Sequence, residues 1–264
     1  MTPQFAKGGL TLVGILAYSF FVLPIFALFV GVLSGNVATS LPDTRLILDA
    51  IALSLRTSAI SLVVIILLGT PLAYIFARWQ FWGKKVAQVL LELPLVMPPA
   101  VAGLALLLTF GRRGLFGDFL LAADVQIVFT QLAVIIAQTF VAAPFYIRTA
   151  QIGFASVPSD LEDAARVDGA NNRHVFWYIT LPLALRALVA GLVLSWARAI
   201  GEFGATILFA GSLQGRTQTM PLLVYAEFER DINAAIWTGI ILLIVAFFAL
   251  LLSQLLAPQD DTSA

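Results

Sequence analysis

The chain has 264 residues, of which 60% are apolar and only 11% are charged, whereas about 25% of the residues in a soluble domain are charged. Most of the chain is therefore expected to lie in a lipid bilayer, and the balance of 15 basic and 15 acidic residues gives no electrostatic signal for a nucleic acid partner. The absence of cysteine excludes thiolate metal or redox sites, and the single histidine, His174, excludes a histidine-based metal cluster, so we expect neither a metal nor a cofactor.

Six segments are long and apolar enough to cross the hydrocarbon core, which takes about 20 residues in a helix. We therefore predict an all-α integral membrane protein with six transmembrane helices, at residues 10–33, 58–77, 86–110, 127–147, 184–209 and 234–257. The first segment, at about 24 residues, is longer than the apolar core of a signal peptide, so it is predicted to be an uncleaved span.

Prolines interrupt several of these segments. Pro24, Pro71 and Pro144 are expected to cause ordinary kinks, because each removes one helical hydrogen bond. The cluster from Pro94 through Pro98 and Pro99 predicts a strongly broken third span. Irregular backbone at membrane depth is tolerated only against protein or water, so this segment is expected to lie at a transport pathway or gate.

Lysine and arginine in the short loops predict the orientation. One side holds eight of them, including Lys7, Arg78 and Arg166, and the other holds six, including Arg112 and Arg113. The bias places the N-terminus, the 78–85 loop and the loop after the fourth span in the cytoplasm, with the C-terminus on the same side. We predict one multi-pass membrane domain, residues 1–258, and a disordered cytoplasmic tail, residues 259–264.

The polar segment between the fourth and fifth spans predicts a short, capped helix at residues 160–168. Ser159 and Glu162 have the spacing of a capping box, in which each side chain accepts a hydrogen bond from the other residue's backbone N–H. Gly169 suits a left-handed C-terminal cap. Asn171 or Asn172 is expected to cap a second short helix that ends near Thr180, before Pro182 opens the fifth span.

The same segment reads D-A-A-x3-G-x9-I-x-L-P and resembles the E-A-A-x3-G-x9-I-x-L-P loop of the membrane subunits of bacterial and archaeal ABC importers. The resemblance implies a type I importer permease fold, in which this coupling helix docks on one of two ATPase subunits. Asp163 stands where the family usually has Glu. An ordinary cytoplasmic helix lying on the membrane is the alternative. The residues expected to act in ATPase coupling are Glu162, Asp163, Ala164, Ala165, Gly169, Ile179, Leu181 and Pro182.

The fifth segment contains R-A-I-G-E-F-G-A-T from Arg198 to Thr206 and resembles molybdate permeases and their sulfate relatives. P-L-V-M-P-P-x3-G, ending at Gly103, resembles another element of that family. The resemblance extends over about residues 54–252. It implies a molybdate or tungstate importer permease in the prokaryotic inner membrane, which works as a homodimer with an extracytoplasmic binding protein docked on outer loops such as 213–231. A sulfate importer permease, which pairs two different subunits, is the alternative.

Arg198 and Glu202 lie four residues apart, so they share a helix face near the middle of the fifth span. A structural ion pair is the favoured interpretation, and a polar wall of the anion pathway is the alternative. Ala197, Gly201 and Ala205 form a row of small residues that predicts close packing against another helix. The residues expected at the pathway or an interface are Pro98, Pro99, Arg198, Gly201 and Glu202.

Other classes of function receive less support from the residues. No G-x4-G-K-[ST] phosphate loop is present, so ATP hydrolysis is expected on a separate subunit. An intramembrane protease would need histidine ligands or a Ser–His pair inside the membrane, and His174 is predicted outside it. A channel would need no coupling loop. The chain is therefore predicted to be a transport subunit without enzymatic activity that works by alternating access.

Overall fold

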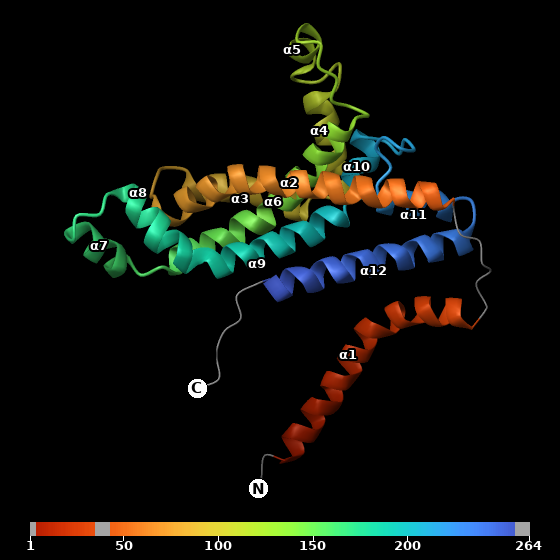
Figure 1. Cartoon of the computed structure of the whole chain (residues 1–264), viewed down its shortest axis with the longest axis horizontal. Helices are drawn as coiled ribbons and strands as arrows, with labels where there is room; N and C mark the ends of the chain where they lie inside the picture. The colour runs from red at the N-terminus through yellow and green to blue at the C-terminus, as the bar shows by residue number, and fades with distance from the viewer. Residues whose placement is uncertain (1–3, 35–42, 257–264) are drawn as a thin grey trace.

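The computed structural model describes residues 4–34 and 43–256, and the predicted tail at 259–264 lies outside them. Within these ranges every regular element is helical (Figure 1). Four helices are long and apolar enough to cross a membrane: α1 (Gln4–Leu33), α2 (Thr44–Arg78), α6 (Gln131–Ser156) and the continuous run Asn172–Ile200. The helical character predicted from the sequence is confirmed.

The third predicted span is broken, as the proline cluster predicted. α3 (Lys84–Val96) and α4 (Pro99–Phe110) meet at an angle of 117° on either side of Met97 and Pro98. Counted as one broken span, this pair brings the total in the described residues to five. α12 (Ile232–Leu256) occupies the sixth predicted segment, but its unbroken run of described side chains, Ile232–Phe248, is shorter than a full span. The described residues thus give four or five candidate spans where six were predicted.

The fifth predicted span, 184–209, is wrong as a single helix. α9 (Leu181–Ile200) ends before Gly201, and α10 (Gly204–Phe209) starts as a separate short helix. At the other end, α8 (Asn172–Val175) and a π turn, η1 (Phe176–Thr180), run into α9 without a break. The wide turn explains the continuity: the N–H of Leu181 bonds to the carbonyl of Phe176, five residues back, which relaxes the helix where Pro182 would otherwise clash.

The core lies where α2, α6 and α9 pack side by side. Its large apolar side chains include Phe76 from α2, Tyr146 and Phe154 from α6, and Leu188 from α9. Hydrogen bonds between side chains and backbone cross the same interfaces, because a hydroxyl group at membrane depth needs a hydrogen-bond partner. The Ser195 hydroxyl of α9, for example, donates to the Ala142 carbonyl of α6 at 2.9 Å.

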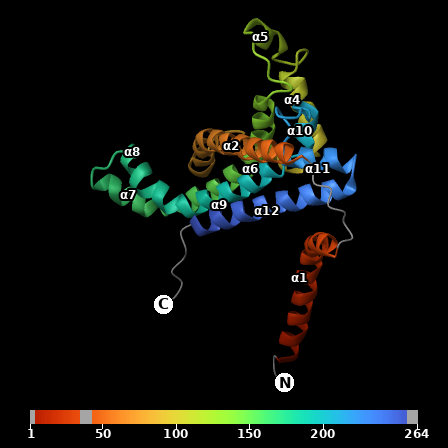
Figure 2. The same cartoon turned by 45° about the vertical axis from the view of Figure 1, so that its right-hand side comes forward.

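Two parts project from this layer of long helices. α4 and the short α5 (Gly117–Ala122) stand away from one face of it, and α7 (Ser159–Val167) lies at one of its ends (Figures 1 and 2). α11 (Met220–Phe228) leads into α12, which runs beside α9. α1 diverges from the other helices, and most of its described side chains are exposed. The two regions singled out in the sequence therefore lie far apart along the molecule.

Candidate functional site

The predicted coupling helix is present as α7, whose limits differ by one residue at each end from the predicted 160–168. Its first turn carries Asp160 and Glu162, which place negative charge at the positive end of the helix dipole. Arg166 lies in the last turn, where a cation is favourable. The local sequence therefore stabilises a two-turn helix in a segment that has little apolar surface of its own to bury.

The predicted capping box is wrong. Pro158 is the N-cap residue and no side chain caps this end of α7. The Glu162 carboxylate instead turns inward, where the residue is only 4% exposed, and its Oε1 accepts hydrogen bonds from Arg78 Nη2 and Thr180 Oγ1, both at 2.7 Å. A charge-assisted hydrogen bond to a guanidinium is stronger than a hydrogen bond to a backbone N–H. Water can satisfy the N–H groups at the start of α7, so Glu162 bonds to Arg78 instead.

Glu162 therefore fastens α7 to two other elements. Arg78 is the last residue of α2, and it also donates to the Val157 carbonyl just before α7 at 3.3 Å. Thr180 is the last residue of η1. Arg78 and Thr180 were missed in the sequence, since nothing local connects them with Glu162. The only available signal was the position of Arg78 at the cytoplasmic end of a predicted span.

The other predicted coupling residues divide into two groups. Asp163 and Ala164 are exposed and Ala165 is half-buried, so they lie on the outer surface of α7. Among the described residues, the Asp163 carboxylate bonds only to Arg166 on the same helix, at 2.6 Å. Ile179, Leu181 and Pro182 instead lie at the junction of η1 and α9, where Leu181 packs on the core. The segment thus has a surface part and an anchoring part.

The predicted caps at the end of α7 and the start of α8 are confirmed. Gly169 has a φ of +92°, and the N–H groups of Gly169 and Ala170 bond to the carbonyls of Arg166 and Ala165 at 3.1 and 2.9 Å. This is the pair of bonds of a Schellman cap, which favours glycine at the left-handed position. Asn171 Oδ1 accepts from the backbone N–H of His174 at 2.9 Å and so caps α8.

The predicted pathway residues gather where the two broken helices meet. Pro98 and Pro99 begin α4, and both are exposed on the single chain. Arg198 Nη1 and Glu202 Oε2 form the predicted ion pair at 2.6 Å, but at the C-terminal end of α9 rather than within a continuous helix. The buried Glu202 carboxylate also accepts from the backbone N–H of Ala205 at 2.7 Å. The pair therefore bridges the break between α9 and α10.

Close backbone packing occurs at this junction, and of the predicted row only Ala205 takes part in it within the described chain, since Ala197 and Gly201 are exposed. The helix breaks at Gly201, which is exposed and contacts no other helix within the described chain. Gly103 and Gly204 make the close approaches instead: a Cβ added to Gly103 would lie 2.8 Å from the Ala205 carbonyl oxygen. α4 and α10 thus pack backbone to backbone, and both broken spans form one unit.

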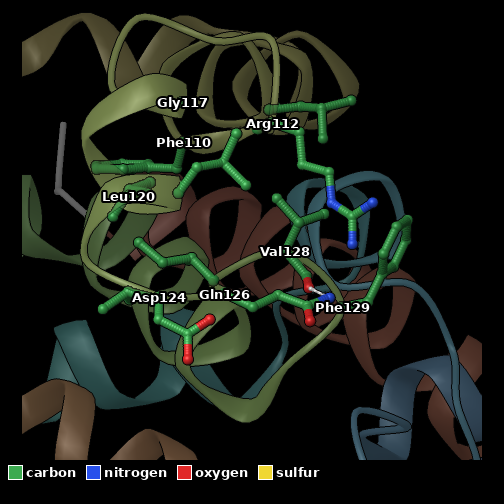
Figure 3. A pocket seen from close by; sticks show the side chains of 13 residues that line it. Phe110, Arg112, Gly117, Leu120, Asp124, Gln126, Val128 and Phe129 are labelled. Atoms are coloured by element: carbon green, nitrogen blue, oxygen red, sulfur yellow. Dashed lines mark hydrogen bonds between the residues drawn. The ribbon is translucent and has the colours of Figure 1, made fainter.

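A further pocket, of about 560 Å³, lies beside α5 at the projecting end and was not predicted (Figure 3). Its lining is mainly apolar, with Arg112, Asp124 and Gln126 as polar members. Figure 3 shows the Arg112 guanidinium beside Phe129 and the Asp124 carboxylate on another side of the pocket. Neither side chain forms an ion pair with another described residue. A doubly charged anion would require more converging donors than this lining provides.

Comparison with known proteins decides the family. Residues 66–259 match the model of the family described as "binding-protein-dependent transport system inner membrane component". The chain belongs to this family. It is therefore a multi-pass inner membrane component of a transport system and not an enzyme.

Similar proteins include several with named transport systems. This inner membrane component is 43% identical over 202 residues to the molybdenum transport system permease protein ModB of Mycobacterium tuberculosis, covering 76% of each chain. It is 41% identical over 216 residues to the probable transport system permease protein NifC of Clostridium pasteurianum, covering 81% of this chain and 75% of that protein. The sulfate transport system permease protein CysW of Synechococcus elongatus is 37% identical over 195 residues, covering 74% and 68%.

Solved structures support the same fold. A chain of a bacterial ABC transporter that imports the acidic polysaccharide alginate matches with a TM-score of 0.72 at 16% identity, covering 97% of this chain and 99% of that one. A chain of the alginate transporter in complex with its pentasaccharide-bound periplasmic protein matches with a TM-score of 0.71 at 19% identity, covering 95% and 93%. These matches place the inner membrane component in the fold of ABC importer permeases.

Proposed function

We propose that this chain is the permease of an ATP-driven ABC importer that moves molybdate or tungstate from a binding protein into the cytoplasm. The observation that carries the substrate class is the 43% identity to a protein named as a molybdenum transport permease, which extends over three quarters of both chains. The resemblance of the segment from Arg198 to Thr206 to molybdate permeases supports the same assignment.

The assembly has two copies of this chain, two ATPase subunits and one extracytoplasmic oxyanion-binding protein. The exposed apolar surface of the single chain supports a second copy: α1 exposes nearly all its described side chains, and Pro98, Pro99 and Gly201 are open at the junction of the broken helices. The chain crosses the membrane six times, with the broken α3–α4 pair as the third span, α12 as the sixth, and both termini in the cytoplasm.

The surface of α7 that includes Asp163, Ala164 and Ala165 docks on the ATPase. Closure of the ATPase dimer around ATP moves α7, and the buried bonds of Glu162 pass that movement to α2 and η1. The broken helices at Pro98 and Glu202 then change their packing, which opens the pathway to the binding protein. Hydrolysis returns the permease to the inward-open state, which gives alternating access.

Sulfate or thiosulfate import is the second candidate, because the sulfate permease CysW is 37% identical over 195 residues. Metal-resolved uptake separates the two candidates, in cells that express this chain with its ATPase and binding protein. We expect ATP-dependent molybdenum accumulation that excess tungstate suppresses and excess sulfate does not. Suppression by sulfate would assign the chain to the sulfate branch, and uptake of neither anion would refute the oxyanion assignment.

The ATPase-docking role is tested by the double variant Gly169→Val and Ala165→Asp. The first change strains the left-handed cap and the second places a charge on the docking surface. We expect loss of transport and of ATPase co-purification with membrane insertion preserved. Gly83→Val is the matched control, because Gly83 also has a positive φ, +82°, with open space around it. Retained co-purification in the double variant would refute the docking role.

A further inference from the structure

A hollow of about 590 Å³ lies next to the coupling segment, between the end of α2 and the start of the α8–η1–α9 helix. Both flanking helices are candidate membrane spans, and the hollow lies at the C-terminal end of one and the N-terminal end of the other. Three arginines line it, and they come from three different elements: Arg78 from α2, Arg166 from α7 and Arg173 from α8. No motif or proposed role above accounts for this grouping.

The charges in and around the hollow do not cancel. Arg78 pairs with the buried Glu162 at 2.7 Å, and Arg166 pairs with Asp163 at 2.6 Å. Arg173 is exposed and forms no ion pair or side-chain hydrogen bond with any other residue that the structure describes. One guanidinium, with its five donors, is therefore left for a ligand. Such a planar fork matches the oxygens of a phosphate group.

The remaining lining is aromatic. Trp79 and Trp177 line the hollow with 58% and 62% of their surfaces exposed, and Tyr74 and Phe176 pack edge to face with ring centres 5.2 Å apart. Exposed tryptophans next to the end of a span are typical of the bilayer interface, where the indole ring contacts acyl chains and its N–H contacts headgroups. The lining of the hollow thus combines aromatic and cationic side chains.

We propose that this hollow binds the headgroup phosphate of an anionic phospholipid, with Arg173 as its main ligand and the aromatic wall against the upper part of the acyl chains. Basic pockets between transmembrane helices are suited to anionic headgroups. The bound lipid touches α2 and α8. Glu162 of α7 bonds to Arg78 of α2 and to Thr180 of η1, the turn that continues α8. The lipid therefore reinforces the same connection between the coupling helix and the spans. The inference requires a membrane-embedded chain and is independent of the transported substrate.

The test uses the purified complex of the full chain with its ATPase subunits. The complex is exposed to equal amounts of phosphatidylglycerol and phosphatidylcholine, and native mass spectrometry measures the lipid and the ATPase subunits retained. We expect preferential retention of phosphatidylglycerol. Arg173→Gln should lower that retention about five-fold, since one basic residue near a membrane surface contributes about that factor. Arg173→Lys should restore most of it, because the positive charge is kept.

The matched control is Arg113→Gln, which removes an exposed arginine at the projecting end of the molecule, far from the hollow. It should retain lipid as the unchanged chain does. Three results would overturn the proposal: equal retention of both lipids by the unchanged chain, unchanged phosphatidylglycerol retention by Arg173→Gln, or displacement of the lipid by excess inorganic phosphate, which would identify a site for a soluble anion. Loss of ATPase subunits from Arg173→Gln with lipid retained would instead assign the hollow to the protein interface.

Discussion

Gly204 lies so close to Pro99 that a Cβ on the glycine would come within 2.4 Å of the Cβ of the proline. The two residues belong to different broken spans, and their contact brings the first turn of α4 against the first turn of α10. The first four backbone N–H groups of each helix have no partner within that helix, so regular hydrogen bonds contribute little to the contact between the two helix starts. The absence of a side chain at Gly204 is therefore what allows the junction to pack.

Replacement of Gly204 by alanine should destabilise this junction by about 1–3 kcal/mol, the usual cost of forcing an extra carbon into a packed site. The melting temperature of the purified permease, followed by loss of the monodisperse gel-filtration peak, measures the effect. Gly239→Ala in α12 is the matched control, because nothing lies within 4 Å of its added Cβ. Equal melting temperatures for the two variants would contradict the close-packing interpretation.

Glu162→Gln should uncouple ATP hydrolysis from transport and lower the thermal stability. The amide keeps the shape of the side chain but removes the charge that Arg78 requires, and a buried hydrogen bond to a charged group contributes about 1.5–3 kcal/mol. Paired measurements of ATPase rate and uptake in proteoliposomes report the ratio of hydrolysis to transport.

Asp163→Asn is the comparison for Glu162→Gln. Its side chain is 69% exposed, and it forms a surface pair worth no more than about 1 kcal/mol. We expect near-normal stability and, if the surface of α7 docks on the ATPase, weaker docking. If Asp163→Asn lowered the thermal stability more than Glu162→Gln does, the buried bonds of Glu162 would not be what holds α7 in place.

Gly169→Ala should cost about 1–2 kcal/mol, because an L-residue in the left-handed conformation brings its Cβ close to the following carbonyl. Gly169→Asn should cost less, since asparagine tolerates this conformation. Nothing lies within 4 Å of a Cβ added at this position, so clashes with other elements do not contribute to the loss of stability. Thermal melting of both variants checks the order, and equal losses would indicate that the backbone conformation is not the cause.

Glu202 should tolerate glutamine better than alanine. The amide oxygen of glutamine can still accept from the Ala205 N–H, which holds the start of α10, whereas alanine removes that acceptor and leaves Arg198 without a partner. Assembly and thermal stability of the two variants measure the difference. If the glutamine variant loses transport while it assembles normally, the charge of Glu202 acts in the pathway as well as in the structure.

Features that depend on neighbours in the chain were predictable. The two-turn helix at α7, its glycine cap and the Asn171 cap follow from residues within one or two turns of each other. The break at Pro98 follows from proline chemistry alone. The Arg198–Glu202 pair also follows from a spacing of four residues. Although α9 ends at Ile200, the N–H groups of Gly201 and Glu202 still bond back to its last turn.

Features that depend on distant residues were not predictable. Arg78 and Glu162 are 84 positions apart, and the capping-box spacing offered Glu162 a plausible local partner instead. The break after Ile200 was hidden because apolar residues continue on both sides of it, which hydropathy cannot distinguish from one long span. The close approaches of Gly103 to Ala205 and of Gly204 to Pro99, across two segments, explain why small residues occur there.

The π turn between Phe176 and Thr180 joins α8 of the coupling segment to α9 in one continuous helix. The uninterrupted run from Asn172 to Ile200 has 29 residues, which at 1.5 Å per residue is about 43 Å. If one end pivots by about 5°, the other end sweeps through about 4 Å. A small tilt beside α7 is thus magnified at the Arg198–Glu202 end, where the contact of Gly204 with Pro99 leaves little room to absorb it without repacking.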